Sequence, residues 1–164
     1  MTVRVQVSCL AMKDNQIAMI QKLNPAYKTY QKFIPPGGHV EFGERLEEAC
    51  AREVAEETGL LVSELELKGV VTFLRADYHS VCFFFLAHRV EGVLESCEPE
   101  KQSSHWVDLA GIGRNEKVPG YHRDFLKVML EEGSYLNGQV EWDAVDDRVA
   151  WSIVRPGQPL VPRA

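Results

Sequence analysis

Short apolar runs broken by turn-forming residues make up most of the chain, a pattern typical of β-structure. Valine, leucine, isoleucine and aromatic residues dominate these runs, which end at Asn, Asp, Gly or Pro. The predicted strands cover residues 3–12, 17–21, 33–34, 65–74, 78–90 and 105–107, with one or two more within 139–154 and a short strand or loop at 40–43. The polar stretch 13–16 between the first two runs predicts a β-hairpin.

Two segments have helical rather than β character. Residues 45–58 are rich in Ala, Glu, Arg and Leu, which are good helix formers, and Gly59 follows them as a stop signal. Residues 121–132 place Phe125 and Met129 on one side of an amphipathic helix that ends at Gly133. Strands and helices in this mixture predict an α/β protein.

The remaining segments are predicted to be connections. Residues 24–32 and the acidic stretch 91–101 are expected to be surface loops, and Gly37-Gly38 is expected to form a backbone-permissive turn. Three prolines within 155–164 indicate a loose tail. The 164 residues contain no repeat and no linker, so 1–164 is predicted to be a single domain.

Composition narrows the function classes. Hydrophobic residues make up 45% of the chain and charged residues 26%, which is typical of a globular protein. The net charge of -6 argues against strong nucleic-acid binding, which needs a basic surface. No apolar run approaches the ~20 residues that span a membrane. Four scattered cysteines outside any Cys-x-x-Cys pair indicate reduced thiols, and we expect a cytoplasmic location.

The predicted helix 45–58 carries an unusual concentration of acid. Glu53, Glu56 and Glu57 fall within about a 100° arc of a helix with 3.6 residues per turn. Such a cluster is typical either of a solvated acidic face or of a site for a hard cation, since Mg²⁺ and Mn²⁺ prefer carboxylate oxygens. The Gly37-Gly38 pair favours the second interpretation, because it lets a main-chain carbonyl or a phosphate approach closely.

The same residues resemble a known family. Gly38, then Glu44 after five residues, then Arg52-Glu53-Val54-Ala55-Glu56-Glu57-Thr58-Gly59-Leu60 after seven more, matches the Nudix box at each of its defined positions. The resemblance implies an α/β/α sandwich with a mixed β-sheet, in which the box helix carries the metal site. It also implies a hydrolase that cleaves a nucleoside diphosphate linked to another group, X.

The resemblance implies roles for individual residues. Glu53, Glu56, Glu57 and the Gly37 carbonyl match metal ligands for Mg²⁺, with Mn²⁺ as a substitute, while Arg52 and Glu44 match the residues that orient the box carboxylates. The general base is expected to be Glu53, with Glu100 and then Glu98 of the acidic loop as alternatives. Gly38 and His39 are expected to contact the substrate phosphates.

The substrate class is less closely defined. Residues 36–44, 78–81 and 98–107 resemble the MutT-type branch, which implies cleavage of a nucleoside triphosphate, such as an oxidised 8-oxo-dGTP-like one, to monophosphate and pyrophosphate. The alternatives are a pyrophosphatase for nucleotide sugars, ADP-ribose or other nucleoside diphosphate-X compounds and, remotely, a non-catalytic nucleotide sensor. The residues after Gly133 do not resemble that branch. The expected partner is a small nucleotide, with a homodimer left open.

Six aromatic side chains are candidates for contact with the nucleobase, since a planar ring stacks well on an aromatic face. Strand alternation requires most of them to point into the core. The candidates are Phe33, Phe73, Tyr78, Phe83, Phe85 and Trp106.

Overall fold

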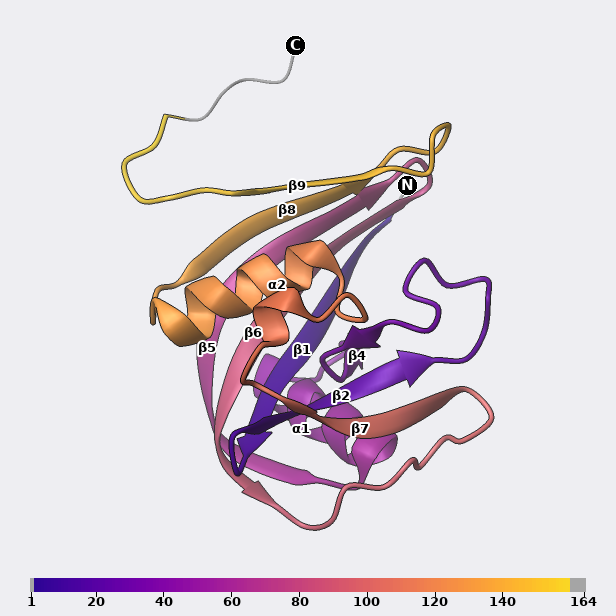
Figure 1. The fold of residues 1–164 in the computed structure, drawn as a ribbon, viewed down its shortest axis with the longest axis vertical. Coiled ribbons are helices and arrows are strands. Elements are labelled where there is room, and N and C mark those ends of the chain that lie inside the picture. The colour runs from indigo at the N-terminus through magenta and orange to yellow at the C-terminus, as the bar shows by residue number, and fades with distance from the viewer. Residues whose placement is uncertain (1, 160–164) are drawn as a thin grey trace.

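The computed structural model describes residues 2–159, which form a nine-stranded mixed sheet and two helices (Figure 1). The strands are β1 (Val3–Lys13), β2 (Gln16–Lys22), β3 (Phe33–Ile34), β4 (Gly37–His39), β5 (Leu61–Arg75), β6 (Tyr78–Glu91), β7 (Gln102–Asp108), β8 (Leu136–Trp142) and β9 (Val149–Ile153). The helices are α1 (Leu46–Thr58) and α2 (Gly120–Leu126). The sheet order is β3-β2-β1-β6-β5-β8-β9, with β4 paired to β1 and β7 paired to β2.

Strand β1 is the centre of the sheet. It pairs in parallel with β6 over nine positions and antiparallel with both β2 and β4. The predicted hairpin of β1 and β2 is confirmed, and its tight turn places Asp14 and Asn15 at positive φ, which these residues tolerate well. The long antiparallel pair of β5 and β6 is also confirmed.

Each face of the sheet has its own apolar core. On one face α1 packs through Ala49, Cys50 and Val54 against β1 and β6. On the other face α2 contributes Tyr121 and Phe125 to a cluster with residues of β5, β6 and β8. Figure 1 shows α2 in front of the sheet and α1 behind it, so the predicted α/β/α sandwich is confirmed.

Helix α1 has well-defined ends. Its N-cap is Arg45, whose backbone N–H donates to the Glu48 carboxylate three residues later. At the other end Gly59 has a φ of 72° and donates its N–H to the Ala55 carbonyl, which closes the last turn. These caps fix where the acidic face of α1 begins and ends.

The sequence interpretation of Gly37-Gly38 as a turn was wrong. Both glycines lie in β4, where Gly37 pairs with Ser8 and Gly38 with Val7 of β1, and neither has a positive φ. Glycine is needed here for space, since a Cβ built on Gly37 would overlap the Val7 carbonyl oxygen. The uncertain segment 40–43 is a loop, because β4 ends at His39.

The C-terminal part differs in detail from its prediction. The second helix is α-helical only to Leu126 and continues as a π-helical turn, Lys127–Glu131. The region 139–154 forms two strands, β8 and β9, which pair antiparallel. The predicted tail 155–164 lies partly outside the described residues, and within the described part Arg155 forms an ion pair with Glu132.

All four cysteines are unpaired thiols, and Cys97 is the exposed one. No helix within residues 2–159 is both long and apolar enough to cross a membrane.

Candidate functional site

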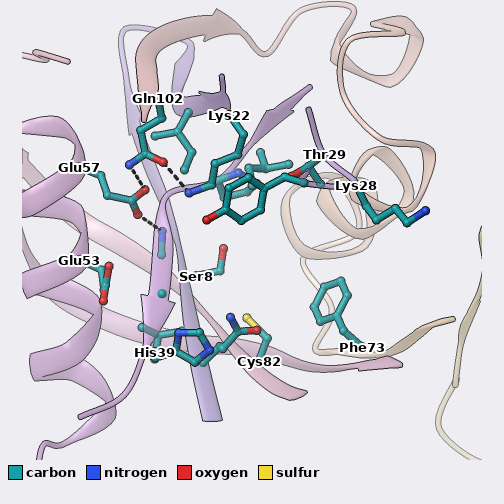
Figure 2. Close-up of a pocket in the computed structure, with 18 of the residues that line it drawn as sticks. Ser8, Lys22, Lys28, Thr29, His39, Glu53, Glu57, Phe73, Cys82 and Gln102 are labelled. Carbon is teal, nitrogen blue, oxygen red and sulfur yellow. Dashed lines mark hydrogen bonds between the residues drawn. The ribbon is translucent and has the colours of Figure 1, made fainter. Parts of the chain in front are cut away.

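A cavity of about 1110 Å³ lies against the acidic helix α1 and extends across the sheet to α2 and β8. Its walls come from β1, β2, β4, α1 and the segment 98–102 at one end, and from β5, β6, α2 and β8 at the other. The loop 24–32 also lines it, with Lys28 and Thr29 on the side of Phe73 (Figure 2). Figure 2 shows Glu53 and Glu57 on one side of this space and Phe73 on the opposite side. The cavity therefore has an acidic end and an aromatic end.

Glu57 is the most buried acid of the site, with 3% of its surface exposed. Its Oε1 accepts a hydrogen bond of 2.8 Å from the Gly37 backbone N–H, and its Oε2 accepts one of 2.5 Å from Gln102 Nε2. The side-chain amide oxygen of Gln102, Oε1, in turn accepts a hydrogen bond of 2.6 Å from Lys22 Nζ (Figure 2). Burial raises the pKa of Glu57 to about 7, and the bond from Gly37 opposes the shift. Hydrogen bonds therefore hold the Glu57 carboxyl in position, and burial makes its ionisation energetically unfavourable.

Arg52 holds the neighbouring acids in place. Its guanidinium donates to Glu44 at 2.7 and 3.0 Å, to Glu53 Oε1 at 2.8 Å and to Glu56 Oε2 at 3.2 Å. It also donates to the His39 carbonyl oxygen at 3.0 Å, which ties α1 to β4. The hydrogen bonds from Arg52 lower the pKa of Glu44 to about 2, so Glu44 remains ionised at neutral pH.

Gly38 lies directly beneath the Glu53 carboxylate. A Cβ built on Gly38 would overlap the carboxyl carbon and oxygens of Glu53, so a larger residue at this position requires Glu53 to move. This close approach explains why residue 38 is a glycine, although its φ is not positive. Strand β4 and helix α1 are thus in contact through Gly38 and Glu53.

The structure brings most of the predicted site residues together, but not all in the same way. Glu53, Glu57, Gly37, Gly38 and His39 line the cavity, and so do Glu98 and Glu100 of the acidic loop. Glu98 accepts a bond of 3.2 Å from Gln102 Nε2, which connects the loop to Glu57. Three predicted site residues, Arg52, Glu44 and Glu56, are not among the lining residues, and the Glu56 side chain is 55% exposed.

The chemistry of the donor set fits a hard divalent cation. Glu53 and Glu57 face the cavity, and the pKa of Glu57 is raised because no positive group fully compensates its burial. Within the described part of the chain, no group of three or more His, Cys, Asp or Glu side chains is arranged to hold a metal ion. Arg52 donates hydrogen bonds to one carboxylate oxygen each of Glu53 and Glu56. The Glu56 side chain is exposed and bonded to Arg52, so it would have to leave Arg52 to join Glu53 and Glu57 at a cation.

Sequence reasoning missed several lining residues. Lys22 and Gln102 complete the network around Glu57, and only the closeness of Gln102 to Glu98 and Glu100 in the chain hinted at this. Of the six aromatic candidates, Phe73 and Tyr78 line the cavity. Phe85 instead packs in the core beneath α1. The missed lining rings are Tyr27, Phe84, Tyr121, His122 and Trp142, which come from segments with no motif of their own.

Comparisons with known proteins agree on one family. The NUDIX domain matches residues 2–129. The ADP-ribose pyrophosphatase of Methanocaldococcus jannaschii is 36% identical over 136 residues, which are 82% of this chain and 75% of that protein. The 8-oxo-dGTP diphosphatase of Escherichia coli is 28% identical and covers 71% of this chain and 88% of its own. A MutT protein from Bacillus halodurans shares the fold, with a TM-score of 0.76 over 95% of this chain and 99% of its own at 23% identity.

Proposed function

This chain belongs to the Nudix hydrolase family, and we propose that it hydrolyses a nucleoside triphosphate to the monophosphate and pyrophosphate. In this reaction the oxygen of water bonds to one phosphorus atom, and the bond from that phosphorus to the bridging oxygen breaks. One proton of the water is accepted by a general base, and pyrophosphate leaves. An oxidised triphosphate is within the proposed substrate class.

The single observation that carries this proposal is the make-up of the cavity's acidic end. Glu53 and Glu57 face it together with the backbone of Gly37 and Gly38. Lys22 and Lys101 also line this end of the cavity, although the chain as a whole is acidic. Carboxylates and lysines side by side suit a polyphosphate that binds with a divalent cation. A triphosphate carries more negative charge than a sugar-linked diphosphate, so the two lysines at this end favour it.

Magnesium, when bound, would neutralise phosphate oxygens and favour ionisation of the attacking water. Glu53, Glu56, Glu57 and the Gly37 carbonyl are the proposed ligands. Arg52 keeps Glu53 and Glu56 in position, and Glu44 keeps Arg52 in position. Gly38 and His39 are proposed to lie against the phosphates. Catalysis of this kind depends mainly on positioning and electrostatics, which is what this network supplies.

The general base is proposed to be Glu53, with Glu100 and Glu98 as alternatives. Glu53 lines the cavity next to Gly38, where the phosphates are expected. Glu98 and Glu100 line the same cavity from the acidic loop, so either could reach a water there. Glu98 is partly engaged by Lys101 at 2.6 Å and by Gln102.

A second candidate function is a pyrophosphatase for ADP-ribose or a related nucleoside diphosphate-X compound. The observation that favours it is the 36% identity to a protein named as an ADP-ribose pyrophosphatase. The acidic end of the cavity serves this reaction equally well, because the cleaved bond is again a phosphoanhydride. The two candidates differ in the products: ADP-ribose yields two monophosphates and no pyrophosphate.

The test is a product analysis of the purified protein with Mg²⁺ against nucleoside triphosphates, 8-oxo-dGTP, ADP-ribose and nucleotide sugars. We expect monophosphate and pyrophosphate from a triphosphate, with kcat reduced at least about 100-fold in Glu53→Gln. Glu47→Gln, on the same helix outside the cavity, is the matched control and is expected to retain activity. Two monophosphates from ADP-ribose with no triphosphate turnover would select the second candidate. Full activity of Glu53→Gln would overturn the proposed site.

A further inference from the structure

The aromatic end of the cavity is a separate chemical environment from the acidic end. Aromatic and imidazole rings from four different elements line it, whereas Glu53, Glu57 and Lys22 line the other end. The rings are Phe73 of β5, Phe84 of β6, Tyr121 and His122 of α2 and Trp142 of β8. Figure 2 shows Phe73 directed into the open space across from Glu53.

The rings at this end are fixed by one another. Trp142 stacks on Phe73 with ring centroids 5.9 Å apart and an interplanar angle of 23°. Tyr121 meets both rings edge-on, with its centroid 5.7 Å from Trp142 and 6.1 Å from Phe73. Phe73 and Trp142 are only partly buried, although Tyr121 behind them is buried. The result is a preformed flat wall with exposed ring surface, which suits stacking by a planar ligand.

Trp142 comes from a part of the chain that the family match does not include. The NUDIX domain matches residues 2–129, whereas Trp142 ends β8. Strand β8 reaches the cavity because it pairs in parallel with β5, with Val140 opposite Phe73, and β9 supports it from the outer edge. The added β8–β9 hairpin therefore completes the aromatic end of the cavity.

The distance between the two ends suits one nucleotide. Strands β1, β6, β5 and β8 lie side by side in that order, and β4 with Gly37 and Gly38 flanks β1. Three strand spacings of about 4.8 Å place β8 about 14 Å from β1. An extended nucleoside polyphosphate with its phosphates near Gly38 would bring its base to the aromatic end.

His122 adds a hydrogen-bonding group to this wall. The side chain is 6% exposed and lines the cavity, and its Nδ1 has no hydrogen-bond partner among residues 2–159. Burial lowers the pKa of His122 to about 3, so the imidazole is neutral and carries one donor and one acceptor. A neutral polar group among rings suits a heterocycle better than a sugar or an anion.

We propose that Trp142, supplied by the β8–β9 hairpin and backed by Phe73, is a specificity-determining residue that stacks on the nucleobase of the substrate, with His122 at the edge of that base. The inference rests on the proposed function, since it takes the phosphates to lie at the acidic end. It assigns recognition of the base to a segment outside the matched family domain.

The test compares Trp142→Leu with the wild type, using Trp151→Leu as the matched control. Trp151 lies on β9 and contacts Tyr121 edge-on, but it is not among the residues that line the cavity. We expect Trp142→Leu to raise KM for the nucleotide at least about 5-fold with little change in kcat, as loss of one base-stacking ring does elsewhere. Trp142→Phe should restore most of the affinity, and Trp151→Leu should leave KM unchanged.

Inorganic tripolyphosphate is the probe that separates base recognition from phosphate binding. Its inhibition constant should be the same in Trp142→Leu as in the wild type, because it has no base. Metal-free binding of the nucleoside monophosphate, measured by calorimetry, should weaken in Trp142→Leu by the same factor as KM rises. These two readouts do not depend on the catalytic step.

An unchanged nucleotide KM in Trp142→Leu would overturn this inference, and so would an equal loss of tripolyphosphate inhibition, which would indicate general distortion of the cavity. In either case loss of turnover in Glu53→Gln would leave the proposed function standing. Full turnover in Glu53→Gln would instead overturn the proposed function itself. Thermal unfolding of each variant establishes that it is folded.

Discussion

Glu57 combines two requirements that oppose each other, since it is nearly inaccessible to solvent and yet has to act as an anion if it holds a cation. Its two hydrogen bonds, from Gly37 and Gln102, position the carboxyl without compensating its burial. The pKa of Glu57 rises to about 7 in the fold, from an ordinary value of 4.5. The folded protein therefore holds an extra proton between about pH 4.5 and pH 7.

This proton makes stability depend on pH in a definite direction. A folded state that binds more protons than the unfolded chain loses stability as pH rises through that window. In metal-free protein, we expect the free energy of unfolding to fall between pH 5 and pH 8 by up to about 3 kcal/mol more in the wild type than in Glu57→Gln, which cannot ionise. Urea unfolding of both proteins in EDTA at the two pH values measures this difference.

The comparison of slopes makes this measurement robust. A constant stability offset from the substitution cancels, and the other titratable groups are the same in both proteins. Parallel pH profiles for the wild type and Glu57→Gln would contradict the assigned pKa shift.

At the level of elements, the contact between β4 and α1 determines the geometry of the acidic end. Strand β4 is inserted beside β1 by its pairing with Val7 and Ser8, and its other side meets Glu53. Arg52 reinforces the contact through the His39 carbonyl. Because no Cβ fits at Gly38 without movement of Glu53, this element pair is sensitive to a single methyl group.

We therefore expect Gly38→Ala to lower kcat about 100-fold while the protein stays folded, because a shift of about 1 Å in a catalytic group is enough for such a loss. The obstructed atoms belong to the end of a flexible side chain, so the free energy of unfolding should change by less than about 1 kcal/mol. Steady-state kinetics and thermal unfolding measure the two effects.

Gly113→Ala is the matched control for this substitution. Gly113 lies in the turn Ile112–Arg114, where the described residues leave a new Cβ free of contacts within 4 Å and φ is not positive. It should leave kcat unchanged. A Gly38→Ala enzyme with normal kcat would show that the position of Glu53 is not critical.

The elements also show what the sequence could and could not predict. The helix 45–58 and the strands 3–12, 65–74 and 78–90 were predictable, because their periodicity and end signals are local. The role of Gly37 and Gly38 was not, because it depends on Val7 and Glu53, which are distant in sequence. The same holds for Lys22, Gln102 and Trp142, which reach the cavity only through strand pairing and have no local motif.

For the whole molecule, the cavity joins segments from the two ends of the chain. The loop 24–32 and the turn between β8 and β9 meet through an ion pair of Lys28 with Asp147. Lys28 also lines the cavity, so this ion pair connects the hairpin to the wall of the proposed substrate site. The two side chains are 40% and 73% exposed, which makes the pair a weak contributor to stability.

We expect Asp147→Asn to separate binding from stability. The free energy of unfolding should change by less than about 1 kcal/mol, because exposed ion pairs contribute little and Asn tolerates the φ of 53° at this position. The KM for the nucleotide should rise severalfold, because Lys28 and its loop lose their anchor. Asp146→Asn, which removes a charge from the same turn but leaves Lys28 paired, should keep KM near the wild-type value.

Ionic strength provides the internal check on this prediction. Salt screens an exposed ion pair, with a Debye length of about 10 Å at 0.1 M and about 3 Å at 1 M. The ratio of the two KM values, Asp147→Asn over wild type, should therefore fall toward one as salt rises, even though both values change. A ratio that is independent of salt, or an equal effect of Asp146→Asn, would contradict the ion pair as the anchor. An equal effect of Asp146→Asn would indicate that the charge of the turn influences binding without the contact to Lys28.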